Sequence, residues 1–183
     1  SDKDIVVQAG GNAGYYVKQY AEIFKYVYTF EPEPVNFYCL TQNANTGNVF
    51  KYQACLGDHR GLVNLLIKEK NRGKNYVNGL GKIPILLIDD LELSCCNLIH
   101  LDVEGYELFA LRGAVETIKR CKPVIALEYF DKCASRFNYN IRDLEAFIES
   151  ISYFGEVIVG FKDPIIVPDN YTSFNESVLL IEI

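Results

Sequence analysis

The chain has 183 residues, of which 49% are apolar and 23% charged, and its formal net charge is −6. This length and composition fit a single globular domain over residues 1–183. The negative charge opposes tight binding to a phosphate backbone, so we expect no nucleic-acid partner. No apolar run approaches the roughly 20 residues that a membrane span needs, so we expect no membrane contact. The cysteines form no C-x-x-C pair, which disfavours a structural zinc site and favours a reducing, cytoplasmic location.

Short apolar runs alternate with stretches of helical period, a pattern typical of βαβ units around a parallel sheet. Helices are expected through Val17 to Phe24, from Pro34, through Leu108 to Ile118 and from Asn140 to Ile151. Strands are expected at residues 5–9, 26–30, 49–55, 97–102, 124–128, 156–160 and 178–183. This order predicts an α/β fold with a doubly wound, mostly parallel sheet. Residues 57–82 carry scattered glycines and predict a β-rich or loop insertion.

The loop after the first strand reads Gln8-Ala9-Gly10-Gly11-Asn12-Ala13-Gly14-Tyr15. A dinucleotide-binding loop would need glycines where Asn12 and Tyr15 stand. Glycines at positions 10 and 14 instead resemble the loop of enzymes that use S-adenosylmethionine. The alternative is a plain glycine-rich turn.

Glu31 follows the second strand and precedes Pro32. A carboxylate at this place can accept hydrogen bonds from both hydroxyls of a ribose, which suits adenosine ligands in general. The alternative is an exposed glutamate before a proline turn.

Two carboxylates follow neighbouring strands, because Asp102 ends the fourth strand and Glu128 ends the fifth. Together they could hold a divalent cation, or one of them could serve as a general base for a substrate hydroxyl. We do not favour Mg²⁺, because no third ligand is evident. Glu104 and Glu107 can be explained as partners of a helix dipole. His100 could be a base at neutral pH, although a hydrogen-bonded histidine within the strand is the simpler interpretation.

Several segments together resemble the FkbM-type methyltransferases, and the resemblance runs from residue 5 to about residue 130. The segments are Gly10–Tyr16, Phe30–Pro32, Leu87–Leu91, Asp102–Glu107, Leu111–Ala114 and Lys122–Val124 with Glu128. The resemblance implies a Rossmann-like, seven-stranded methyltransferase fold whose last strand is antiparallel. It also implies S-adenosylmethionine as the cofactor and O-methylation of a small molecule or sugar.

The resemblance also implies roles for individual residues. Glu31, followed by Pro32, would hold the ribose, and Asp102 would lie beside the transferable methyl group. The methionine part would be lined by Gly10, Asn12, Gly14 and Tyr15, and the adenine would be flanked by Cys55 and Leu56.

Two positions depart from the family pattern. Gln8 stands where the family usually has an acidic residue, so it could hydrogen-bond the ammonium group of the cofactor but brings no charge. His100 stands where the family often has lysine.

Two other functions stay open at this stage. Gln8 is consistent with a catalytically weak or inactive domain that only binds the cofactor. A nucleic-acid methyltransferase is disfavoured by the acidic charge.

Residues 57–96 and 129–140 are expected to shape the pocket of a small-molecule acceptor. Four aromatic residues there could form its wall, or else core or dimer contacts: Tyr129, Phe130, Phe137 and Tyr139. The sequence specifies neither the acceptor nor the oligomeric state.

Overall fold

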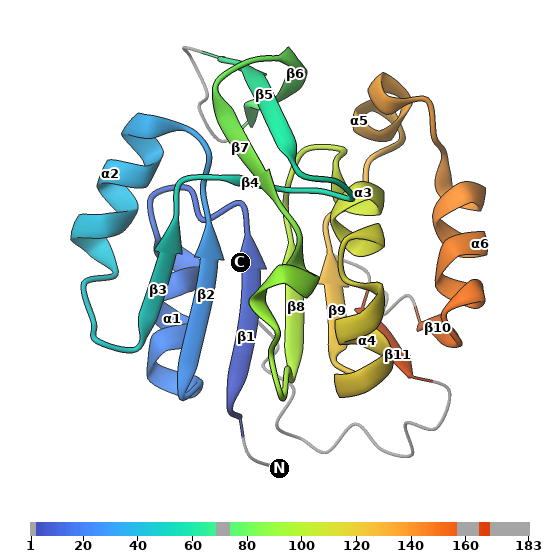
Figure 1. Ribbon diagram of the computed structural model, residues 1–183, viewed down its shortest axis with the longest axis horizontal. Helices are drawn as coiled ribbons and strands as arrows, with labels where there is room; N and C mark the ends of the chain where they lie inside the picture. The colour runs from blue at the N-terminus through green and yellow to red at the C-terminus, as the bar shows by residue number, and fades with distance from the viewer. Residues whose placement is uncertain (1–2, 69–73, 157–164, 169–183) are drawn as a thin grey trace.

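The computed structural model describes residues 3–68, 74–156 and 165–168, which form two β-sheets and the helices packed on them (Figure 1). The smaller sheet lies above the carboxyl ends of the parallel strands of the larger sheet (Figure 1). Within the described ranges, no helix combines the length and the apolar character needed to cross a membrane.

The larger sheet contains β1 (Ile5–Ala9), β2 (Tyr26–Phe30), β3 (Val49–Tyr52), β8 (Leu98–Leu101), β9 (Val124–Leu127), β10 (Tyr153–Glu156) and β11 (Ile165–Pro168). The smaller sheet contains β4 (Cys55–Leu56), β5 (Gly61–Leu66), β6 (Tyr76–Leu80) and β7 (Ile83–Leu86). The α-helices are α1 (Tyr15–Ile23), α2 (Pro34–Asn43), α3 (Glu107–Arg112), α4 (Val115–Cys121), α5 (Asp131–Ala134) and α6 (Ile141–Ser150). Two 3₁₀ turns are η2 (Ile88–Leu91) and η3 (Ser135–Phe137).

The larger sheet has the strand order β10-β11-β9-β8-β1-β2-β3. Strands β9, β8, β1, β2 and β3 all run parallel, which confirms the predicted parallel sheet. The chain progresses from β1 through β2 to β3 on one side and continues from β8 to β9 on the other. Beside β1 the order therefore reverses, and such a switch point is where open α/β sheets bind ligands.

Both faces of the sheet are buried because successive side chains of a strand point to opposite faces. Val6 of β1 packs in a cluster with Val17 of α1 and Leu40 of α2. Val7, the next residue, packs in a second cluster with Leu111 of α3. This burial on both faces explains why β1 is apolar without alternation.

The carboxyl-terminal strands are described only in part. β11 is antiparallel both to β9 and to β10. The strand predicted at residues 156–160 begins earlier, because β10 spans Tyr153–Glu156. Residues 157–160 and the strand predicted at 178–183 lie outside the described residues.

The strand predicted at residues 49–55 is divided between the two sheets, so that prediction was wrong in extent. β3 ends at Tyr52 in the larger sheet, and Cys55 begins β4, which pairs with β7 in the smaller sheet. The insertion predicted at residues 57–82 is β-rich, because β5 and β6 form an antiparallel pair there. An apolar run alone does not reveal that its two ends belong to different sheets.

The helix predicted through Leu108 to Ile118 is broken into α3 and α4 at Gly113. A Cβ at Gly113 would lie 1.9 Å from the carbonyl oxygen of Gly57, so the backbones touch at this point. The carboxylate of Asp89 then accepts hydrogen bonds from the amides of Glu116 and Thr117, at 3.1 and 2.7 Å. A distant side chain thus caps α4, an interaction that helical periodicity does not show.

Candidate cofactor and acceptor site

A hollow that is partly open to solvent lies where β1, β2 and β8 end and the smaller sheet covers them, and it spans about 600 Å³ when the open space at its mouth is included. Strand-end loops of the larger sheet supply one side, and the β5–β6 hairpin supplies the other. The hollow is lined by Ala9, Gly10, Asn12, Phe30, Glu31, Pro32, Asn36, Ala54, Cys55, Leu56, Leu65, Asn75, Tyr76, Val77, Asp102, Val103, Glu104 and Tyr106.

The loop after β1 is pressed against its neighbours by close backbone contacts. The amides of Gly10 and Gly11 both donate to the carbonyl of Phe30, at 3.0 and 3.1 Å. Gly10 has φ +86°, and a Cβ on it would lie 1.9 Å from the carbonyl oxygen of Asp102. Only glycine fits this place, because the conformation is left-handed and the end of β8 fills the space.

Glu31 is a buried carboxylate that both shapes the hollow and lines it. Its two oxygens each accept one backbone amide, from Asn12 at 2.7 Å and from Glu33 at 2.8 Å. Burial raises the pKa of Glu31, and these two amides partly oppose the rise. The side chain of Asn36 also hydrogen-bonds this carboxylate. A carboxylate offers about four lone-pair sites, so Glu31 can still accept a hydroxyl group of a ligand.

The wall that follows β3 is apolar and is made by Ala54, Cys55 and Leu56. All three side chains are buried. Burial, and then the nearby charge of Glu31, raises the pKa of the Cys55 thiol to about 12. Cys55 is therefore a neutral thiol at physiological pH, which suits contact with an aromatic ring rather than nucleophilic chemistry.

The part of the lining that follows β8 carries two acidic residues, Asp102 and Glu104. Carboxylate oxygens of Asp102, Glu104 and Glu128 all lie within 4.8 Å of one another. Burial raises the pKa of Asp102, and the charge of Glu128 and a hydrogen bond to it raise it further. Glu104, which the sequence analysis explained as a partner of a helix dipole, is the third carboxylate of this cluster. Proximity of carboxylates is common without a metal, so it does not assign an ion.

The turn that carries these acids is held by Glu107, which is 1% exposed. One oxygen of Glu107 accepts the amides of Val103 and Gly105, at 3.2 and 3.1 Å. The other accepts the hydroxyl of Tyr139 at 3.1 Å. Burial raises the pKa of Glu107 to about 7. Glu107 therefore fixes the backbone between Asp102 and α3 from behind the hollow.

The structure brings seven of the predicted site residues into the lining, namely Gly10, Asn12, Glu31, Pro32, Cys55, Leu56 and Asp102. Glu128 does not line the hollow but touches Asp102. The four others lie elsewhere: Gln8, Gly14, Tyr15 and His100.

Each of these four has a local environment that explains its position. Gln8 is fully buried, and its Oε1 accepts the hydroxyl of Thr29 at 2.6 Å. Gly14 precedes α1 at φ +92°, and Tyr15 is 71% exposed. His100 is buried, with its Nδ1 3.0 Å from the Tyr20 hydroxyl, so it occupies the hydrogen-bonded strand position.

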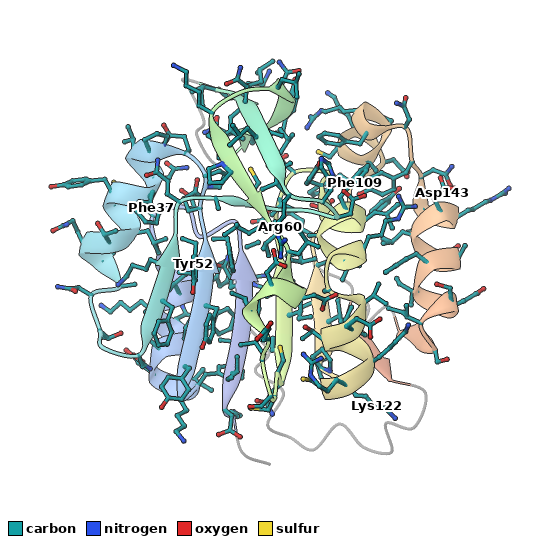
Figure 2. All side chains as sticks on the ribbon, viewed as in Figure 1. Phe37, Tyr52, Arg60, Phe109, Lys122 and Asp143 are labelled. Atoms are coloured by element: carbon teal, nitrogen blue, oxygen red, sulfur yellow. The ribbon has the colours of Figure 1, made fainter. Side chains whose placement is uncertain are left out.

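The sequence analysis missed much of the lining. Tyr76 and Asn75 come from the insertion, whose pairing could not be read from the sequence, and Tyr106 comes from the turn after β8. None of the four aromatic residues suggested for the acceptor wall lines the hollow. Phe137 and Tyr139 instead pack with Phe109, which Figure 2 labels on α3.

This fold and strand-end site define an α/β methyltransferase architecture. Residues 82–155 match the family model of the Methyltransferase FkbM domain. The structure is similar to that of the methyltransferase FkbM from Methylobacillus flagellatus, with TM-score 0.61 and 20% identity, over 90% of this chain and 43% of that chain. The predicted resemblance to the FkbM-type methyltransferases is therefore confirmed.

Other solved structures share the fold at lower identity. A TehB-like SAM-dependent methyltransferase from Corynebacterium glutamicum gives TM-score 0.51 and 10% identity, over 92% of this chain and 81% of that chain. A ribosomal protein L11 methylase from Lactobacillus delbrueckii gives TM-score 0.51 and 8% identity, over 90% of this chain and 69% of that chain. A search of curated proteins gave no significant match. The chain spans less than half of the FkbM structure that it matches.

Proposed function

We propose that this methyltransferase domain binds S-adenosylmethionine and methylates a hydroxyl group of a small molecule or sugar. One observation carries the proposal: a single hollow is lined both by the buried carboxylate of Glu31 and by the partly buried carboxylate of Asp102. The two residues follow β2 and β8, the neighbours of β1 on either side of the switch point. An adenosine derivative that carries a reactive group beyond its ribose suits a hollow lined by these two carboxylates.

The residues present fit that cofactor. The carboxylate of Glu31 can accept a ribose hydroxyl, and Cys55 and Leu56 offer an apolar surface for the adenine. Gly10 and Asn12 lie between Glu31 and Asp102 in the lining and would contact the methionine part. When bound, S-adenosylmethionine supplies an electrophilic methyl group. The tasks of the protein are then alignment of the acceptor and removal of its proton.

Asp102 is the residue to which we assign proton removal. Burial raises its pKa, and the charges of Glu128 and Glu104 raise it further, so Asp102 holds a proton over a wider pH range than an exposed aspartate does. Asp102 can therefore take the proton of an acceptor only in its ionised form, which is a stronger base than an exposed aspartate and which becomes more populated as the pH rises. An acceptor hydroxyl beside Asp102 would pass its proton to that carboxylate as the oxygen attacks. We assign no such step to His100, which is bonded to Tyr20 outside the lining.

Three further expectations belong to the same proposal. The fold would be that of the Rossmann-like methyltransferases, a seven-stranded sheet whose last strand is antiparallel. The protein would act in the cytoplasm on a small-molecule acceptor, without nucleic acid or membrane. Residues 1–183 would form a single domain.

A second candidate function is cofactor binding with weak or no turnover, and Gln8 favours it. Its Oε1 is already bonded to Thr29, and no hydrogen-bond partner is found for its Nε2 among the described residues. A glutamine in this arrangement offers the ammonium group of the cofactor no charge. Methyl transfer to any acceptor hydroxyl would exclude this function.

Thermal unfolding with and without S-adenosylmethionine tests the proposal. Ligand at about 100 times its dissociation constant adds roughly 2.7 kcal/mol to the free energy of unfolding. For a chain of this length, that is a rise of roughly 5–10 °C in Tm. We expect the rise in the wild type and its loss in Glu31→Ala. No rise at millimolar ligand would refute the proposal.

A further inference from the structure

The amide of Asn75 has a fixed orientation at the edge of the hollow. Asn75 precedes β6, and its Oδ1 accepts the backbone amide of Lys68 at 2.7 Å. Lys68 follows β5, so this bond ties together the two arms of the β5–β6 hairpin. Because the Lys68 N–H can only donate, the oxygen of the Asn75 amide must face it, and the NH₂ group must point elsewhere.

That NH₂ group is buried and has no hydrogen-bond partner among the described residues. A buried donor without an acceptor is unfavourable, and such groups are rare in native proteins. Gln8 carries the other unpartnered donor within the described ranges, but Gln8 does not line the hollow, whereas Asn75 does. A ligand in the hollow can therefore supply the missing acceptor to Asn75.

The hairpin presents Asn75 on the apolar side of the hollow. Leu65 and Val77, which pair across the hairpin, line the hollow and pack against the cluster that contains Cys55. Cys55 is a residue of the proposed adenine wall. Adenine carries ring nitrogens that accept hydrogen bonds, and an asparagine amide is a common partner of that ring.

The neighbouring residue holds the hairpin in place. The guanidinium of Arg136, in η3, lies 4.2 Å from the centre of the Tyr76 ring. Arg136 also donates to the carbonyl of Glu104 at 3.3 Å. The hairpin, η3 and the turn after β8 are thereby connected around the hollow, so Asn75 is positioned before a ligand arrives.

We propose that Asn75 is a specificity residue that donates a hydrogen bond from Nδ2 to a ring nitrogen of the adenine of the cofactor. This inference rests on the proposed function, since it needs an adenosine cofactor in the hollow. It adds the insertion to the cofactor site, so that the smaller sheet recognises the base while Glu31 holds the ribose.

Calorimetric titration with S-adenosylhomocysteine and with adenosine tests the inference on the full chain. Asn75→Asp keeps an oxygen for Lys68 but removes the donor, whereas Asn75→Ala removes both. Asn78→Asp adds the same charge to an exposed position of β6 and serves as the control. We expect Asn75→Asp and Asn75→Ala to weaken both ligands about tenfold, and Asn78→Asp to bind as the wild type does.

The remaining outcomes separate this inference from the proposed function. If the wild type binds neither ligand, the proposed function fails and the inference fails with it. If the wild type binds and Asn75→Asp binds equally well, the role of Asn75 is refuted while the proposed function stands. If Asn75→Asp weakens S-adenosylhomocysteine but not adenosine, the amide contacts another part of the cofactor and the adenine assignment is refuted.

Discussion

Replacing Glu31 by glutamine removes one acceptor from a buried site that needs two. Each oxygen of Glu31 accepts one backbone amide, from Asn12 and from Glu33. Glutamine has one oxygen, so one of these amides would face an NH₂ group. A hydrogen bond to a charged group contributes about 1.5–3 kcal/mol. Burial of the charged carboxylate is itself unfavourable, as its raised pKa shows, so removing the charge offsets part of this loss. We therefore expect a net decrease of about 1–2 kcal/mol in the free energy of unfolding.

Urea unfolding measures this loss as a lower midpoint at unchanged slope. Thermal unfolding should show a Tm lower by about 2–8 °C for a chain of this length. Glu145→Gln makes the same chemical change on the exposed face of α6 and should stay within about 0.5 kcal/mol of the wild type. If Glu31→Gln unfolds at the wild-type midpoint, the two amide bonds do not hold the loop and this account of the site is wrong.

Three further changes test other parts of the structure. Because burial and Glu128 raise the folded-state pKa of Asp102, the folded protein holds a proton that the unfolded chain releases, and wild-type stability should fall as the pH rises above about 4. In Asp102→Asn the urea midpoint should differ less between pH 5 and pH 8 than it does in the wild type. An equal difference in the two proteins would refute the raised pKa of Asp102. Gly10→Ala places a Cβ against the carbonyl of Asp102 at φ +86° and should cost about 2–4 kcal/mol in chemical unfolding, so a stable variant would contradict the close approach. Asn140→Ala removes the capping box of α6 and should lower the free energy of unfolding by about 1 kcal/mol. If the helical signal and the unfolding midpoint stay as in the wild type, the capping box does not stabilise α6.

The sequence was most informative where one residue and its neighbours carry the whole signal. The helix predicted from Asn140 is α6, and the structure has a complete capping box of Asn140 and Asp143 at its start. The apolar runs of β1 and β2 were predicted with their observed bounds. These features depend on local backbone chemistry, which three or four consecutive residues specify.

The sequence was least informative where contacts join distant parts of the chain. Nothing near Gly113 indicates that Gly57 approaches it, yet this contact separates α3 from α4. Likewise, the NH₂ group of Asn75, which has no hydrogen-bond partner among the described residues, becomes visible only once the smaller sheet covers the hollow.

The candidate site shows the same division between local and distant contributions. Glu31 and Asp102 could be predicted because a parallel sheet gathers its strand ends at one edge, so residues that follow strands directly must lie near the switch point. Which other side chains join them depends on how the insertion pairs and where it packs. Tertiary structure alone decided that Tyr76 and Asn75 enter the lining and that His100 stays outside it. The physical reason is that a short local segment specifies each strand and the residue that follows it, whereas the packing of an insertion depends on surfaces that form only when the sheet is complete.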